Sequence, residues 1–346
     1  MKITTKFHEH LNNNKYVSKT LINTKQILGS LLLTTLLFSS CKTTDDNDLP
    51  PFEPNPATAQ EFKNIKDEAL ADITQNFSFN SDDGYITLTS ENGVQLGING
   101  DCLTLNGNEI TGNVDIEYVE IFEKGNMLTT NKPTMGTMPN GDKAMLLTGG
   151  EFFIEATQNG QILDTNCAFN LSIPTSLTGG ADPEMVLWEG TIDEDDNLTW
   201  DEVEDATGQG GVFVEGGQYY AFLNNFGWSN VDRFYSDPRP KTQIQAQAPV
   251  GYNFTNSAIY LSYDGEDTGL AALDTYDGEL NLFSEHYGQI PIGLECHVIF
   301  VTEDNGQWRY AIKAVTIAEN DIITFTFEDT SVTSEASLIS IINALP

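Results

Sequence analysis

Short segments of alternating apolar and polar residues recur along most of the chain after Phe77. In one of them Val114 and Ile116 alternate with acidic residues, which is the two-residue period of a strand with one buried face. Asn-Gly and Asp-Gly pairs separate many of these segments and favour tight hairpins; they lie at 83–84, 92–93, 106–107, 140–141 and 159–160. The pattern predicts an antiparallel β-sandwich from Phe77 to about Pro174.

The same kind of segment continues beyond a Gly-Gly-Ala-Asp-Pro stretch at 179–183, which predicts a domain boundary near residue 180. Segments such as MVLWEGTI, QYYAFLNNFGW, CHVIFVTE and WRYAIKAVTI follow it and are typical of strands. We therefore expect a mostly β fold with two sandwich-like domains, covering residues 59–180 and 181–346.

Two stretches instead show the three- and four-residue spacing of an amphipathic helix. The first follows Thr58, which with Glu61 predicts a capping box. The second is short and lies between Ser334 and Leu345. The spaced apolar residues are Phe62, Ile65, Ala69, Leu70 and Ile73 in the first stretch and Leu338, Ile341, Ile342 and Leu345 in the second. The sequence thus predicts one N-terminal helix and one short C-terminal helix.

A short apolar run near the beginning of the chain precedes a single cysteine. The run from Ile27 to Phe38 has about 12 residues, fewer than the roughly 20 that a membrane-spanning helix needs. Five lysines lie upstream, and Ser39 and Ser40 directly precede Cys41. A cationic flank, a short apolar core and small residues before a cleavage point indicate a secretory signal peptide over residues 1–40.

Small residues directly before a lone cysteine resemble a bacterial lipobox, although Phe38 stands where a strict lipobox has Leu. The acidic tail at 42–48 resembles the export signal of surface lipoproteins of the Bacteroidota. This resemblance implies lipidation of Cys41 and attachment to the membrane through that lipid. It also implies an outer-membrane lipoprotein that faces the cell exterior. Residues 41–58 are acidic and Pro-rich, which predicts a tether.

The region from about Asp82 to Pro174 resembles ZU5-like β-domains. The residues that carry the resemblance are ITGNVDI at 110–116, LTGGEFFI at 147–154 and the Asn-Gly pair at 159–160. It implies a β-sandwich for residues 59–180. Some ZU5-containing proteins cleave themselves at a His-Phe-Ser type motif, but His286 is followed by Tyr and His297 by Val. Self-cleavage is therefore not implied.

The chain is strongly acidic, with 51 acidic and 16 basic residues and a net charge of −35. Cleavage before Cys41 removes five lysines and one glutamate, so the mature chain is more acidic still. Such a charge repels nucleic acid and anionic lipid headgroups. We expect no nucleic-acid partner.

Three cysteines remain after Cys41, namely Cys102, Cys167 and Cys296, and their spacing does not match a metal site such as C-x-x-C. Within strands they would serve as small buried apolar residues. An exported protein can also form a disulfide. In that case we expect Cys102–Cys167, because both lie in the first predicted domain.

The acidic segment between two predicted strands has the ligand spacing of a calcium loop, with Asp193, Asp195 and Asn197 at positions 1, 3 and 5. Leu198 occupies the position that needs Gly, and the flanking sequences predict strands where an EF-hand has helices. We therefore expect a solvated hairpin turn, with weak Ca²⁺ binding as the alternative. No other cofactor is expected.

The segment from Gly227 to Lys241 combines aromatic residues with three basic residues. It resembles a G-W-x-N-x-D-R-F signature of uncharacterised secreted and lipid-anchored proteins of the Bacteroidota. Exposed aromatic residues beside an arginine could bind a sugar or a carboxylate, whereas a structural role would bury them and pair the arginine internally. The candidate residues for a ligand-binding or organising site are Trp228, Asn230, Asp232, Arg233 and Tyr235.

Motifs that support catalysis are absent from the sequence: it has no G-x-S-x-G, HExxH, P-loop or dinucleotide fingerprint. Paired carboxylates for glycoside hydrolysis remain open, because acidic residues are abundant. The leading hypothesis is a surface-anchored lipoprotein with a non-enzymatic binding or structural role at the outer membrane, towards a protein or glycan partner. The alternative is a carbohydrate-binding or glycan-degrading accessory protein.

Overall fold

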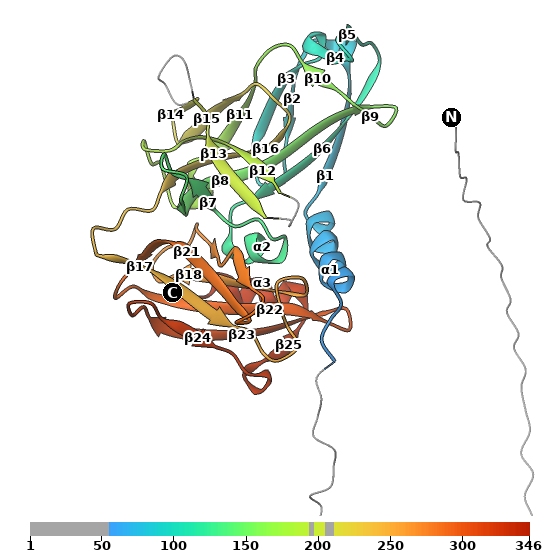
Figure 1. Cartoon of the computed structure of the whole chain (residues 1–346). Helices are drawn as coiled ribbons and strands as arrows, with labels where there is room; N and C mark the ends of the chain where they lie inside the picture. Colours follow the sequence, from blue (N-terminus) through green and yellow to red (C-terminus); the bar gives the residue numbers. More distant parts are fainter. Residues whose placement is uncertain (1–54, 194–196, 205–210) are drawn as a thin grey trace, which may run out of the picture. The chain divides into compact units, whose positions relative to one another are not determined.

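Strands make up most of the residues that the computed structural model describes, which are 55–193, 197–204 and 211–346 (Figure 1). This part contains 25 strands and three α-helices, so the predicted mostly β fold class is confirmed. The helices are α1 (Ala59–Asp72), α2 (Lys124–Thr129) and α3 (Glu335–Asn343). The two predicted helices are α1 and α3, whereas the short helix α2 was not predicted.

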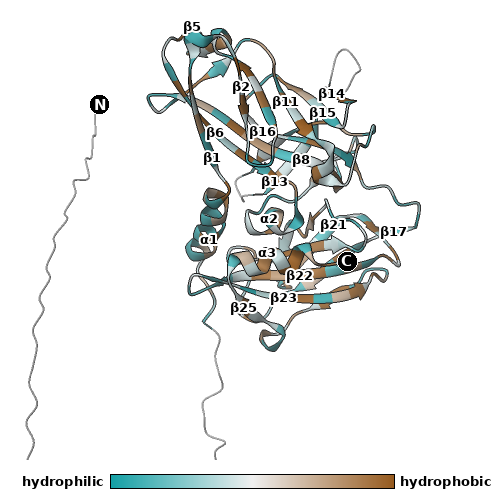
Figure 2. Ribbon diagram, turned by 180° about the vertical axis from the view of Figure 1, so that it is seen from behind, coloured by the Kyte–Doolittle hydropathy of each residue, from teal (hydrophilic) through white to brown (hydrophobic). Residues whose placement is uncertain are grey.

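The first helix begins as the sequence predicts. The backbone N–H of Glu61 donates to the Thr58 hydroxyl at 3.2 Å, and the Glu61 carboxylate accepts from the Thr58 backbone N–H at 2.8 Å. This capping box satisfies two backbone donors that the first turn leaves without a partner. Phe62, Ile65 and Ala69 are buried, and Figure 2 shows that the rest of α1 is largely hydrophilic. The capping-box prediction is confirmed.

Sheet A has eight strands, and the 16-residue strand β8 lies at its centre. β8 pairs with β6 and β16, and also with β7 and β9 at its two ends. In the order of the sheet the strands are β1 (Gln75–Asn80), β6 (Asn113–Ile121), β8 (Lys143–Gln158), β16 (Gly227–Phe234), β12 (Val186–Ile192), β13 (Leu198–Glu202) and β7 (Met135–Thr137), with β9 (Gln161–Ile162) beside β8.

Sheet B has five antiparallel strands and shares an apolar core with sheet A. The strands are β14 (Val212–Glu215), β15 (Gln218–Leu223), β11 (Phe169–Pro174), β3 (Gln95–Asn99) and β2 (Tyr85–Thr89). The small sheet C consists of β10 (Asp164–Thr165), β4 (Leu103–Leu105) and β5 (Asn108–Glu109). Ile116, Phe152 and Val231 of sheet A pack in one buried cluster with Leu96 and Leu171 of sheet B.

A second buried core lies between sheets D and E. Sheet D is formed by β20 (Thr275–Asp277), β21 (Leu282–Pro291), β17 (Lys241–Gln247) and β24 (Ile322–Thr324). Sheet E is formed by β19 (Ala271–Ala272), β18 (Ser257–Tyr263), β22 (Glu295–Asp304), β23 (Gln307–Thr316) and β25 (Ser331–Thr333). A further apolar cluster joins residues of all three helices, β6 of sheet A and β22 of sheet E.

At the predicted boundary near residue 180 the chain makes a turn, and strands from both sides of this turn belong to sheets A and B. Strands β12, β13 and β16 follow this turn and complete sheet A, and β14 and β15 complete sheet B. Gly179 and Gly180 have φ of 85° and 129°, so the two glycines allow a turn here and mark no break between sheets. Leu187 and Val231 beyond the turn lie in the core between the two sheets. The described residues belong to a single compact unit.

The expected cysteine pairing is present as a disulfide between Cys102 and Cys167. The alternative prediction, that the cysteines are unpaired buried residues, is therefore wrong for Cys102 and Cys167. It is confirmed for Cys296, which is free and buried. The bond joins residues 65 positions apart: Cys102 directly precedes β4, and Cys167 lies between β10 and β11.

Removing this disulfide should destabilise the protein, because the bond restricts the unfolded chain across a long loop. We expect the Cys102→Ser/Cys167→Ser double variant to lose about 2–4 kcal/mol in free energy of unfolding. Urea denaturation with and without a reductant measures this. The reductant should lower the stability of the wild type and leave the double variant unchanged; equal stability of oxidised wild type and variant contradicts the prediction.

Candidate functional site

The five residues predicted as a site lie on or directly after β16, the strand between β8 and β12 in sheet A. Asn230 and Asp232 are fully buried, and the Asn230 Nδ2 donates to the Asp232 Oδ2 at 2.7 Å. The pairing of β16 with β8 is irregular between these two residues, opposite Gly149 and Gly150. The structure thus joins two of the predicted residues directly.

Glu151 of β8, which sequence reasoning missed, lies opposite Asn230 in the register of the sheet. The side chains of Glu151 and Asp232 are 0% exposed. Within the described part of the chain, neither carboxyl oxygen of Glu151 has a hydrogen-bond partner, nor has the Asp232 Oδ1. The Thr148 hydroxyl donates to the Asn230 Oδ1 at 2.7 Å and completes the cluster. The available signal was an acidic residue inside the apolar segment AMLLTGGEFFI.

Burial raises the pKa of Glu151 well above its ordinary value, because the charged form loses its hydration. The nearby Asp232 raises the pKa of Glu151 further, and the charge of Lys132 opposes this. Burial likewise raises the pKa of Asp232, and the hydrogen bond from the Asn230 side chain opposes this. The two carboxyls therefore retain protons at pH values where exposed carboxyls have lost them.

Trp228 is half-buried in an aromatic cluster and is not an exposed platform. Its ring centroid lies 5.3 Å from that of Phe153 and 6.4 Å from that of Trp200. The Nζ of buried Lys132 lies 5.4 Å from the Trp228 ring centroid and donates to the Thr130 carbonyl at 3.2 Å. These contacts favour the structural interpretation of Trp228.

Arg233 follows Asp232 but forms its ion pair elsewhere. Its Nε donates to the Asp182 Oδ2 at 2.6 Å, and its Nη1 donates to the Phe234 carbonyl at 3.1 Å. The Asp182 backbone N–H in turn donates to the Tyr219 hydroxyl at 2.8 Å. Arg233 thus fastens the loop before β12 to sheet A. The partner Asp182 is 28% exposed, so breaking this pair does not leave a buried charge behind.

Tyr235 lies just beyond β16, and its contacts differ from those of Asn230 and Asp232. Its hydroxyl donates to the Asp237 Oδ2 at 3.2 Å, and its ring packs against Tyr263 with centroids 5.2 Å apart. It belongs to the core between sheets D and E. The structure therefore does not bring Tyr235 together with Asn230 and Asp232.

The strands that flank the acidic segment pair as an antiparallel hairpin. Ile192 of β12 pairs with Leu198 of β13, and the Asp193 carboxylate accepts from the backbone and side-chain nitrogens of Asn197 at 3.0 and 3.2 Å. Asp195 lies outside the described residues, as does Cys41 with the predicted signal peptide and most of the tether. In the described ranges no three His, Cys, Asp or Glu side chains gather in a way that could hold a metal ion.

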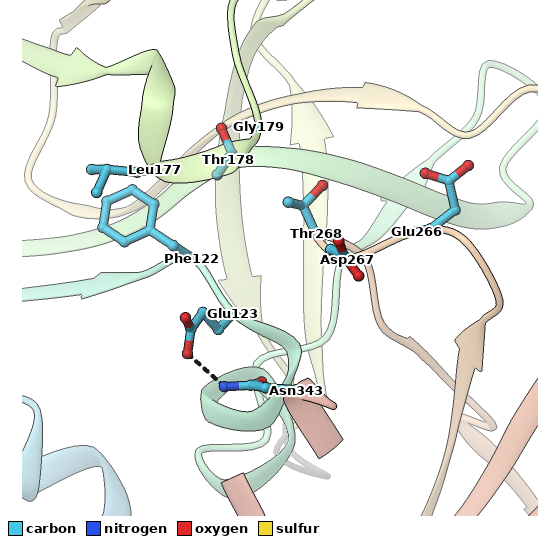
Figure 3. Close-up of a pocket in the computed structure, with 9 residues that line it drawn as sticks. All are labelled: Phe122, Glu123, Leu177, Thr178, Gly179, Glu266, Asp267, Thr268 and Asn343. Carbon is cyan, nitrogen blue, oxygen red and sulfur yellow. Dashed lines mark hydrogen bonds between the residues drawn. The ribbon is translucent and has the colours of Figure 1, made fainter. Parts of the chain in front are cut away.

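An acidic pocket of about 440 Å³ lies near α2 and α3 (Figure 3). Glu123, Glu266 and Asp267 line it, and the Glu123 carboxylate accepts from the Asn343 side chain at 2.5 Å. Burial raises the pKa of Glu266, and the charge of Arg233 opposes this. Lys124, which follows Glu123 in the chain, is buried, and its Nζ donates to the Ser262 hydroxyl at 3.0 Å. The three carboxyl groups in its lining suit a cationic group.

The sequence matches no protein-family model and no curated protein. Among the described residues, no helix has the length and apolar character that crossing a membrane requires.

Replacing Glu151 by Gln should stabilise the protein at neutral and alkaline pH. A raised carboxyl pKa in the fold gives stability that is present at acid pH and is lost as pH rises through the folded value. We expect wild type and Glu151→Gln to have similar free energies of unfolding near pH 4.5. Above pH 4.5 the variant should become more stable than the wild type by about 1.4 kcal/mol per pH unit, as long as Glu151 stays protonated in the folded wild type.

Urea denaturation from pH 4.5 to 8 measures this difference. Glu155→Gln on the same strand is the matched control, because Glu155 is only half-buried. A pH-independent difference for Glu151→Gln contradicts the assignment.

Arg233→Ala should lower the free energy of unfolding by about 1–2 kcal/mol, because it removes a charge-assisted hydrogen bond between partly exposed groups. A double-mutant cycle with Asp182→Ala separates this bond from other effects of truncation. The two changes should be less than additive. Full additivity, or a wild-type melting temperature for Arg233→Ala, argues against the structural role.

Proposed function

We propose that the chain is an outer-membrane lipoprotein, anchored through Cys41 and facing the cell exterior, that binds an extracellular partner and does not catalyse a reaction. The observation that carries the binding role is the outer face of sheet B, on the opposite side from the core. Tyr85, Phe213 and Phe222 on that sheet are 62%, 43% and 44% exposed. Large aromatic side chains gathered on one open face are typical of an interaction site.

The buried acids favour binding over catalysis. Glu151 and Asp232 have raised pKa values, which is a property of many catalytic carboxyls. A catalytic group must also come within hydrogen-bond reach of its substrate, and both side chains are 0% exposed. We assign these two residues to the packing of sheet A.

The proposed anchoring rests on the order of features at 1–48: a cationic flank, a short apolar run, Cys41 and an acidic tail. A tether over 41–58 would connect the lipid to α1, which begins at Ala59. The proposal also includes the resemblance of residues 82–174 to ZU5-like domains. Such β-domains are compatible with the strands found in this region and with an extracellular location.

Replacing Cys41 by Ser should abolish lipidation, because Ser lacks the thiol to which the lipid is attached. Metabolic labelling with a clickable fatty acid is expected to mark the wild type and not Cys41→Ser. The variant should leave the membrane fraction or remain unprocessed. Cys296→Ser, which changes a buried cysteine of β22, is the matched control and should be labelled like wild type. Equal labelling of wild type and Cys41→Ser rejects the anchor.

A further inference from the structure

The outer face of sheet B is almost free of charge on a strongly acidic chain. Side chains alternate between the core and this face along each strand, as the burial patterns of β3, β11 and β15 show. Among the strand residues that the structure describes on this face, Glu215 at one edge is the only charged one. The outer face consists of Tyr85, Thr87, Thr89, Gln95, Gly97, Asn99, Asn170, Ser172, Pro174, Gln218, Tyr220, Phe222, Phe213 and Glu215.

Tyr85 lies across the neighbouring strand. It belongs to the edge strand β2, but its hydroxyl donates to the Asn170 Oδ1 on β11, at 3.0 Å. To reach it, the side chain crosses β3 above Gly97, where a Cβ atom would collide with the Tyr85 hydroxyl. The tyrosine ring therefore lies along the sheet with one side towards the solvent, and its hydroxyl is fixed.

Phe222 and Phe213 continue the aromatic surface on the other side of Asn170. Phe222 is paired with Asn170 in the register of β11 and β15. The ring centroids of Phe222 and Phe213 lie 5.9 Å apart at an interplanar angle of 81°. From β2 to β15 are three strand spacings, or about 14 Å. Tyr85 and Phe222 thus lie on either side of the polar Asn170, and the distance between their strands is greater than the width of one sugar ring.

The polar groups of the face are amides and hydroxyls. The Asn170 Oδ1 is occupied by Tyr85, so its Nδ2 can donate to a ligand. The Ser172 hydroxyl donates to the Gln218 Oε1 at 3.2 Å, which fixes a second amide on the same face. Such groups both donate and accept hydrogen bonds, as sugar hydroxyls do, while the C–H faces of a sugar ring pack on aromatic rings.

We propose that the outer face of sheet B binds an uncharged oligosaccharide, with Tyr85 and Phe222 as stacking residues and Asn170 as a hydrogen-bonding residue. This rests on the proposed binding function and names its ligand. An acidic glycan is repelled by the net charge of −35. A basic protein partner would require carboxylates on this face, and its described strand residues offer Glu215 alone.

Affinity electrophoresis of the full-length protein in detergent tests the proposal. The probes are four neutral polysaccharides, namely mixed-linkage β-glucan, xyloglucan, galactomannan and starch, with polygalacturonate as the acidic comparison. At least one neutral polysaccharide should retard the wild type, and polygalacturonate should not. Tyr85→Ala and Phe222→Ala should each weaken retardation at least tenfold, whereas Tyr85→Phe, which keeps the ring, should retain most of it.

Gly97→Ala should also weaken binding, because the added methyl group displaces the Tyr85 side chain without removing it. Leu280→Ala is the matched control: Leu280 is 59% exposed and precedes β21 of sheet D, and its loss should leave retardation unchanged. The melting temperature of each variant checks that it is folded.

Two outcomes overturn the proposal. Retardation by none of the four neutral polysaccharides, in a folded protein that is labelled with fatty acid, rejects the ligand class while the anchor stands. Retardation that persists in both Tyr85→Ala and Phe222→Ala places the binding site elsewhere. Failure of the anchor appears separately, as an unlabelled wild type that still binds the polysaccharide.

Discussion

The burial of the middle of strand β8 on both faces of sheet A is the constraint on which the rest of the structure depends. Residues 144–152 of β8 are all buried, because one face packs against sheet B and the other contacts the helices and the aromatic cluster of Trp188, Trp200 and Trp228. A strand in this position has no solvent side on which to place an acid. Glu151 is therefore desolvated, and the layer arrangement accounts for its raised pKa.

Local signals in the sequence predicted local structure well. The Thr58–Glu61 capping box, the β12–β13 hairpin and the strand character of most segments depend on residues a few positions apart. Asp182, the partner of Arg233, is 51 positions away in the sequence, and the joining of β12 and β16 to the earlier strands is also non-local. Alternation says which face of a strand is buried but not which strand lies next to it, so the Gly179–Gly180 turn was interpreted as a domain boundary.

The same limitation applied to the candidate sites. An aromatic and basic segment suggested an exposed site around Trp228, but the aromatic residues of β16 pack inside and Arg233 is satisfied by Asp182. The exposed aromatic residues Tyr85, Phe213 and Phe222 are dispersed over 138 positions of sequence and share a face only because β2, β11, β15 and β14 belong to one sheet. No spacing rule within a single segment can detect such a surface.

Sheets A and B thus divide two roles between them. Around the middle of β8, sheet A is covered on both faces, so the polar residues there must satisfy one another or remain neutral, as Asn230, Asp232 and Glu151 do. Sheet B is covered on one face only. Its outer residues do not pack in the core, so side chains that bind a ligand there do not disturb the core packing. A rigid scaffold that leaves one sheet face open is suited to holding flat aromatic groups in fixed positions, because pre-ordering them reduces the entropy lost on binding.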